Sequence, residues 1–94
     1  MTRDAVLARL KDLKPWLASR GVARVRLFGS YARGDARPDS DLDLLVDLSR
    51  PMGLEFFGIE EELSHRLGVK VDLHTERSLH RLVLREALSE VIDA

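Results

Sequence analysis

The sequence contains no cysteine, so it can form neither a disulfide framework nor a thiolate metal site, and it gives no support for secretion. It also lacks a long apolar run. Charged residues interrupt every hydrophobic stretch, and none approaches the roughly 20 residues of a membrane span. The first ten residues, MTRDAVLARL, carry too many charges for a signal peptide. We therefore expect a cytoplasmic protein with no membrane contact.

An excess of either charge sign is also missing. The chain has 15 Lys+Arg against 16 Asp+Glu, without the basic surplus that marks a general nucleic-acid binder, so free nucleic acid is not an expected partner. Hydrophobic residues make up 45% of the chain and charged residues 33%, which is typical of a folded domain and argues against disorder. Its 94 residues suffice for one hydrophobic core, so residues 1–94 are predicted to form a single domain.

The spacing of the apolar residues predicts an alternation of helices and strands. Apolar residues three and four apart indicate helices, and strict alternation indicates strands. The predicted elements are helix 4–19, strand 22–28, a loop over 31–40 that starts with one helical turn, strand 41–48, helix 54–67, strand 69–75 and helix 78–92. This order predicts a small α/β (α+β) domain with a three- or four-stranded sheet packed on helices.

Three positions are predicted to set helix ends. Thr2 or Asp4 is placed to cap the first helix, and Ser78 to cap the last one. Gly68 follows the middle helix, where a left-handed glycine commonly ends a helix.

Two aspartates stand out in the strand 41–48. Asp41 and Asp43 are two residues apart, so their side chains point to the same face, about 6 to 7 Å apart along the strand. Unpaired carboxylates beside a core are costly unless they bind a metal or a partner charge. Mg²⁺ is typically held by one or two protein carboxylates, with water and phosphate oxygens in its other positions. The pair therefore predicts a magnesium site.

Gly29 and Ser30 follow the first strand directly and are predicted to open a short helix. Glycine allows a phosphate to approach the backbone, while the amides and the Ser30 hydroxyl can donate hydrogen bonds to it. A phosphate cradle next to a metal clamp implies a nucleoside triphosphate as ligand.

A third carboxylate, Asp72, lies in the strand 69–75. If this strand neighbours strand 41–48, Asp72 joins the pair in a cluster suited to one or two Mg²⁺ ions and an in-line displacement at phosphorus. Asp72 can also accept a proton from an attacking hydroxyl.

The motifs GSYARG and SDLDLLV, followed one helix later by VDL, resemble the DNA polymerase beta-like nucleotidyltransferase superfamily. They look most like the minimal nucleotidyltransferases of prokaryotes, which are short and usually encoded beside a HEPN-domain protein. The resemblance implies a nucleotidyltransferase fold with a small mixed sheet. It also implies that Gly29 and Ser30 hold the triphosphate, Asp41 and Asp43 bind Mg²⁺, and Asp72 is the third ligand or the base.

Within the minimal branch, the resemblance implies an antitoxin that transfers AMP from ATP to a tyrosine hydroxyl of a HEPN toxin, a ribonuclease. A hetero-oligomer with that toxin is expected, because the chain is too short to carry its own acceptor-binding domain. Arg33 lies where its planar guanidinium can reach a phosphate.

Several alternatives remain open at this point. The chain can be a non-catalytic antitoxin that covers a HEPN protein, or an enzyme that modifies a small molecule or an RNA end. The aspartate pair can be a solvated strand end or a loop cap. Asp47 is interpreted as structural or as a surface charge. His74 shares the face of Asp72 and is interpreted most simply as an ordinary exposed histidine, with a neighbour of the site as the alternative. An exposed member of Phe56–Phe57, and the apolar excess of LHRLVLREALSEVI, predict partner surfaces, with core packing as the alternative for the latter.

Overall fold

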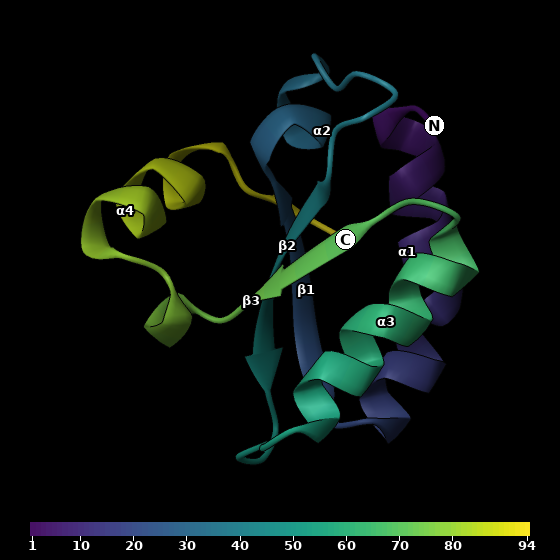
Figure 1. Cartoon of the computed structure of the whole chain (residues 1–94), viewed down its shortest axis with the longest axis vertical. Coiled ribbons are helices and arrows are strands. Elements are labelled where there is room, and N and C mark those ends of the chain that lie inside the picture. Colours follow the sequence, from purple (N-terminus) through teal and green to yellow (C-terminus); the bar gives the residue numbers. More distant parts are fainter.

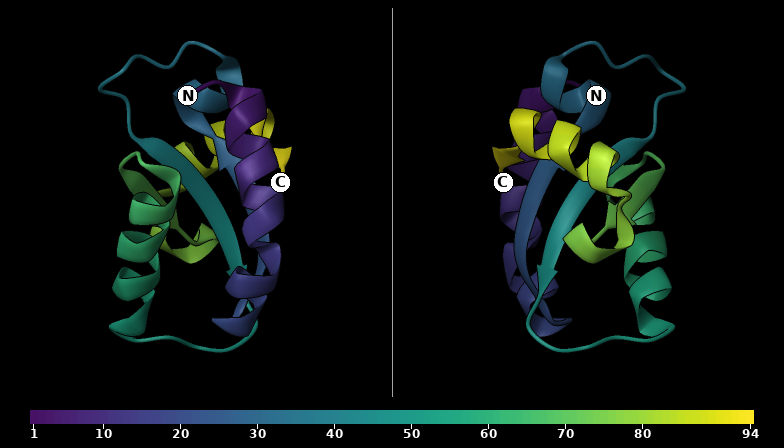
Figure 2. Two further views of the ribbon diagram at one scale, coloured as in Figure 1. Left: turned by 90° about the vertical axis from the view of Figure 1, so that its right-hand side faces the viewer. Right: turned by 90° about the vertical axis from the view of Figure 1, so that its left-hand side faces the viewer.

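A computed structural model describes residues 1–94 in full, and its helices lie on both faces of one central sheet (Figures 1 and 2). In chain order the elements are α1 (Arg3–Ser19), β1 (Val22–Phe28), α2 (Gly29–Arg33), β2 (Leu42–Leu48), α3 (Glu55–Leu67), β3 (Val71–His74), the 3₁₀ helix η1 (Glu76–Ser78), α4 (Arg81–Glu90) and β4 (Ile92–Asp93). The long helices α1 and α3 cover one face, and α4 lies on the opposite face. None of the helices combines the length and the apolar character needed to cross a membrane.

The four strands form a mixed sheet in the order β3-β2-β1-β4. β2 runs antiparallel to β1 and parallel to β3, while β4 pairs antiparallel with β1 at the other edge. The predicted class, a small α/β domain with a three- or four-stranded sheet, is confirmed. The parallel pair matters most for function, because it aligns Asp43 of β2 with Asp72 of β3.

Two of the predicted helix ends are confirmed. The Thr2 side chain accepts a hydrogen bond of 3.1 Å from the Ala5 N–H and caps α1, so Thr2 rather than Asp4 is the cap. Gly68 follows α3 with a φ of 72°, the left-handed conformation expected of a terminating glycine.

The prediction for the C-terminal helix is wrong at both ends. Ser78 belongs to η1, where it shares a capping box with Thr75, and α4 begins only at Arg81 with the His80 side chain as its cap. At the other end α4 stops at Glu90, and Ile92 pairs with β1 instead of continuing the helix. The two errors have different causes: the local capping box of η1 takes Ser78 out of the helix, and pairing with the distant strand β1 ends the helix before Ile92.

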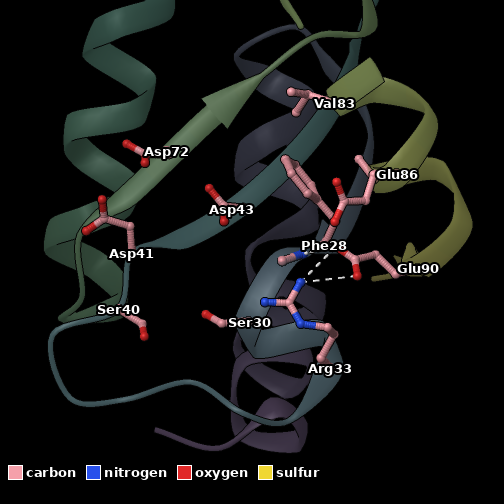
Figure 3. A pocket seen from close by; sticks show the side chains of 12 residues that line it. Phe28, Ser30, Arg33, Ser40, Asp41, Asp43, Asp72, Val83, Glu86 and Glu90 are labelled. Carbon is pink, nitrogen blue, oxygen red and sulfur yellow. Dashed lines mark hydrogen bonds and ion pairs between the residues drawn. The ribbon is translucent and has the colours of Figure 1, made fainter. Parts of the chain in front are cut away.

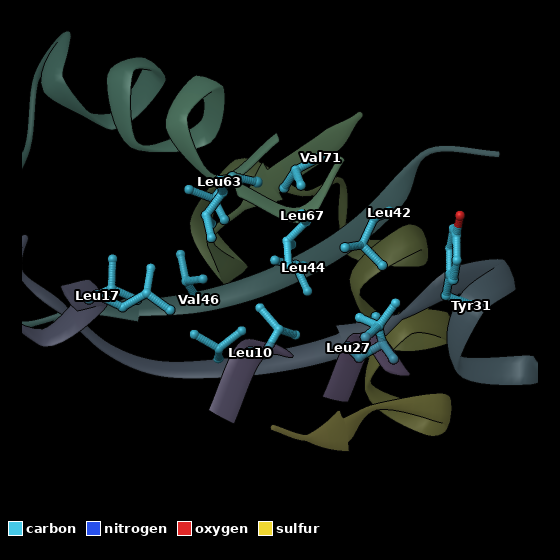
Figure 4. Close-up of a cluster of buried hydrophobic side chains, with 14 of the residues drawn as sticks. Leu10, Leu17, Leu27, Tyr31, Leu42, Leu44, Val46, Leu63, Leu67 and Val71 are labelled. Carbon is cyan, nitrogen blue, oxygen red and sulfur yellow. The ribbon is translucent and has the colours of Figure 1, made fainter. Parts of the chain in front are cut away.

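The main core fills the space between the sheet and the helices α1 and α3 (Figure 4). Leucine and valine side chains of the sheet and of α1 and α3 meet there, and the fully buried ones are Val6, Leu10, Leu17, Leu27, Leu42, Leu44, Val46, Leu63 and Val71. The alternation predicted for β2 therefore holds. Its odd-numbered residues face the other side of the sheet, and this leaves Asp43 free to serve a site there.

On that second face, a buried arginine ties β1 to the segments around it. Arg26 is 4% exposed and donates hydrogen bonds to Asp47 at 2.9 Å and to Glu76 at 3.2 Å. Asp47 is thus a structural ion-pair partner, in line with the interpretation of its sequence position, and η1 is anchored to the sheet through Glu76.

The edge strand β3 has its outward-facing amides covered by side chains of α3. The Leu73 N–H donates to the Glu60 carboxylate at 2.7 Å, and the Val71 N–H donates to the Ser64 hydroxyl at 3.0 Å. These bonds fix the strand that carries Asp72 and leave fewer free donors for edge-to-edge association.

Removing the Glu60 carboxylate is expected to destabilise the fold. A hydrogen bond to a charged group contributes about 1 to 3 kcal/mol, and Glu60→Ala leaves the Leu73 amide without its partner, so a loss of that size is expected. Denaturant unfolding measures it. Glu61→Ala, at an exposed position one residue further along α3, is the matched control and should change stability little. Equal losses in the two variants would contradict the role of Glu60 at the edge.

Candidate active site

Four segments that are far apart in the sequence line one open pocket at the end of the sheet (Figure 3). They are the turn from β1 into α2, the start of β2, the strand β3 and the inner side of α4. The lining residues are Phe28, Gly29, Ser30, Arg33, Ser40, Asp41, Asp43, Asp72, Val83, Glu86, Ala87 and Glu90. All six residues predicted from the sequence as site residues are among them.

The three aspartates converge because β2 and β3 are parallel neighbours. Asp43 and Asp72 are register partners, and one ligand atom each from Asp43, Asp72 and His74 lie within 4.8 Å of one another. Asp41 immediately precedes β2, and its carboxylate lies 3.6 Å from the Lys70 ammonium. The prediction for Asp72 required strand β3 to lie next to strand β2, and the two strands are neighbours.

Crowding at the pocket raises the pKa of Asp72. Partial burial raises the pKa of Asp72, and the adjacent Asp41 and Asp43 carboxylates raise it further. The adjacent Asp43 carboxylate raises the pKa of His74, whose Nε2 lies 3.7 Å from an Asp43 oxygen. A cation placed among the carboxylates relieves the same repulsion, and it competes with protons for Asp72.

His74 is a pocket neighbour that sequence reasoning undervalued. Interpreting it as an ordinary exposed histidine is wrong, because its side chain is only 29% exposed, faces Asp43 and packs its ring 5.6 Å from that of Phe28. The alternative interpretation, that the alternation of β3 puts His74 on the face of Asp72 and beside the site, is the correct one.

The turn at Gly29 brings the backbone of α2 against Asp43. Gly29 has a φ of 77°, and a Cβ atom built on it would collide with the Asp43 carboxylate. Only glycine therefore combines this conformation with this approach. The predicted short helix after Gly29 is confirmed as α2, and the Ser30 hydroxyl points across the pocket toward Ser40 (Figure 3).

Helix α4 supplies a wall that the sequence did not predict, with Val83, Glu86 and Glu90 on its pocket side. A Glu90 oxygen accepts a hydrogen bond of 3.1 Å from the Gly29 N–H, and the Arg33 guanidinium reaches both Glu90 oxygens at 3.2 Å. Arg33 also donates to Asp35 at 3.3 Å. Glutamates on a helix are common, so only the fold reveals that these two face the pocket.

The chain has clear relatives among characterised families. Residues 4–94 match the family of nucleotidyltransferase domains. The protein adenylyltransferase MntA of Thermococcus cleftensis is 44% identical over 73 residues, which cover 77% of this chain and 74% of that protein.

Solved structures agree with this relationship. A structure described as a minimal nucleotidyltransferase matches 98% of this chain and 95% of its own, with a TM-score of 0.82 and 40% identity. The complex of the tri-AMPylated HEPN toxin of Shewanella oneidensis with its MNT antitoxin matches in fold alone, with a TM-score of 0.61 and 20% identity over 97% of this chain and 66% of that one. The mixed sheet, the flanking helices and the sequence match together place this chain in the family of nucleotidyltransferase domains.

Proposed function

We propose that this chain is a Mg²⁺-dependent protein adenylyltransferase that transfers AMP from ATP to a tyrosine hydroxyl of a HEPN-domain toxin and so acts as its antitoxin. The observation that carries the proposal is the meeting of Asp41, Asp43 and Asp72 beside the Gly29–Ser30 turn in one pocket. The names of the relatives, a protein adenylyltransferase and an antitoxin bound to an AMPylated HEPN toxin, support the class of acceptor.

The residues present fit a magnesium ion. Asp41, Asp43 and Asp72 offer hard carboxylate oxygens from neighbouring segments, and their mutual repulsion favours a bound cation. Magnesium supplies charge neutralisation at the triphosphate and stabilises the charge that develops on the attacking and leaving oxygens. We assign Asp41 and Asp43 as its ligands, with Asp72 as third ligand or base.

The chain's own residues then divide the remaining work. The Gly29 turn and the Ser30 hydroxyl hold phosphate oxygens, and Arg33 reaches a phosphate with its planar fork. Asp72 takes the proton of the acceptor hydroxyl, whose oxygen forms a bond to the α-phosphorus. The bond from the α-phosphorus to the bridging oxygen breaks, and pyrophosphate leaves.

Exposed apolar residues favour a protein as the acceptor. Leu82, Val83 and Leu88 of α4 are exposed, and Val83 also lines the pocket. Phe57 on α3 is 60% exposed, whereas Phe56 packs against the core. The exposure predicted at both places from the sequence is therefore present. A partner seated on α4 would bring an acceptor side chain to the pocket mouth.

The decisive experiment is transfer of label from α-labelled ATP, with Mg²⁺, to a HEPN-domain protein that forms a complex with this chain. We expect covalent label on the partner, loss of that label with EDTA, and no label from γ-labelled ATP because pyrophosphate departs. Changing the acceptor tyrosine of the partner to phenylalanine removes the label while the complex still forms. A tight complex with no label from any of the four nucleotides would instead establish a non-catalytic antitoxin.

A further inference from the structure

We propose that Glu90 is an internal competitor of the triphosphate, which must leave Gly29 and Arg33 before a nucleotide can use them. The inference rests on the proposed function, because it takes these two residues to be phosphate-binding groups. It adds a regulatory contact in which Glu90 of the C-terminal helix occupies these two donors until a ligand or partner releases it.

The contact uses the donors that a phosphate needs. One Glu90 oxygen accepts from the Gly29 N–H and from Arg33, and the second oxygen accepts from Arg33 as well. The Glu90 side chain is only 21% exposed, so it is held in the pocket and does not sample the solvent freely. A carboxylate and a phosphate are both anionic acceptors, and neither can take the Gly29 amide and the Arg33 fork while the other holds them.

The negative charge of the pocket prevents the Glu90 carboxylate and a phosphate from occupying it together. Five carboxylates line it against the single guanidinium of Arg33; they belong to Asp41, Asp43, Asp72, Glu86 and Glu90. Metal ions can neutralise Asp41, Asp43 and Asp72, which lie at β2 and β3. Glu90 approaches from α4 on the opposite side, so its negative charge remains next to an incoming phosphate and repels it.

Release of Glu90 requires movement of its side chain and not of the backbone. Ala87 of α4 packs on Phe28 and Leu45 in a small cluster that Val91 also contacts, and Ile92 pairs with β1, so the chain is anchored on both sides of Glu90. The Glu90 carboxylate is bound only through the hydrogen bonds to Gly29 and Arg33, which rotation of the side chain can break.

The test compares Glu90→Ala with Glu86→Ala, which removes the same charge one turn earlier on the same side of α4. Glu86 lines the pocket, but its side chain makes no hydrogen bond to Gly29 or Arg33. Affinity for α,β-methylene-ATP with Mg²⁺ is measured by titration calorimetry, and the unfolding midpoint without nucleotide is measured in parallel. We expect Glu90→Ala to bind the analogue about tenfold more tightly, because Gly29 and Arg33 are then free for the phosphates in every molecule. Its unfolding midpoint should fall, since the closing contact is lost, and Glu86→Ala should gain much less affinity.

Each other outcome overturns the inference in a distinct way. Equal or weaker binding by Glu90→Ala would make Glu90 a positioning residue for Arg33 or a nucleotide contact. Equal gains in affinity in both variants would show that the net charge of the pocket, and not the contact of Glu90 with Gly29 and Arg33, sets the affinity. If the wild type binds the analogue and transfers label, but Glu90→Ala gains no affinity, this inference is wrong and the proposed function stands. Absence of binding in all three proteins would overturn the proposed function, and the inference with it.

Discussion

Replacing Asp41 and Asp43 together by asparagine is expected to lower the rate of AMP transfer by at least about a thousandfold, a loss of roughly 4 kcal/mol of transition-state stabilisation. Asparagine keeps the size of aspartate but removes both charges. Mg²⁺ prefers carboxylate ligands and is then left with Asp72 alone from the proposed set. The initial rate of label transfer from α-labelled ATP to the HEPN partner measures the effect.

The fold of this double variant should survive. The aspartates lie at the entrance to β2 and on its pocket face, outside the main core, and without metal their charges repel Asp72. Their loss is therefore expected to leave the unfolding midpoint unchanged or raise it. Asp39→Asn is the matched control, because Asp39 is exposed in the preceding loop and does not line the pocket. Full activity in the double variant, or equal loss in the control, would refute the metal assignment.

The parts of the site that sequence predicted are those fixed by short-range geometry. Residues two apart on a strand share a face, so the pairing of Asp41 with Asp43 follows from the spacing alone. Gly29 and Ser30 come directly after a strand, and this position sets the turn into α2. Asp72 required one further assumption, the adjacency of β2 and β3, which the sheet order satisfies.

What sequence could not predict depends on long-range packing. Glu86 and Glu90 enter the pocket because α4 crosses the second face of the sheet, and the helical spacing of the C-terminal segment does not say where the helix docks. The two-residue strand β4 exists only because β1 offers it a free edge. The burial of Arg26 could not be predicted either. Alternation places a charged residue on one face of a strand whether that face is solvated or, as here, covered.

Gly29→Ala is the second substitution for which we expect a large loss of activity, and Gly34→Ala is a close control for it. Both residues have positive φ, 77° and 82°, so alanine at either place is strained by about 1 to 2 kcal/mol. A Cβ at Gly34 meets nothing within 4 Å. At Gly29 it collides with the Asp43 carboxylate and also lies 3.2 Å from the Asp43 Cγ and 3.3 Å from its Cβ, so rotation of the carboxylate alone gives no relief.

Gly29→Ala is therefore expected to displace Asp43 and to lower AMP transfer by about a hundredfold or more, since a misplacement of about 1 Å can cost that much. Gly34→Ala should keep most of its activity at a similar loss of stability. Rates of label transfer and unfolding midpoints of the two variants separate the effect of displacing Asp43 from the effect of backbone strain. If both lose activity in proportion to stability, backbone strain explains the result and the approach of α2 to Asp43 has no part in it. Loss in Gly29→Ala alone ties the turn to the position of the Asp43 carboxylate, because strain of the same kind is present in both proteins.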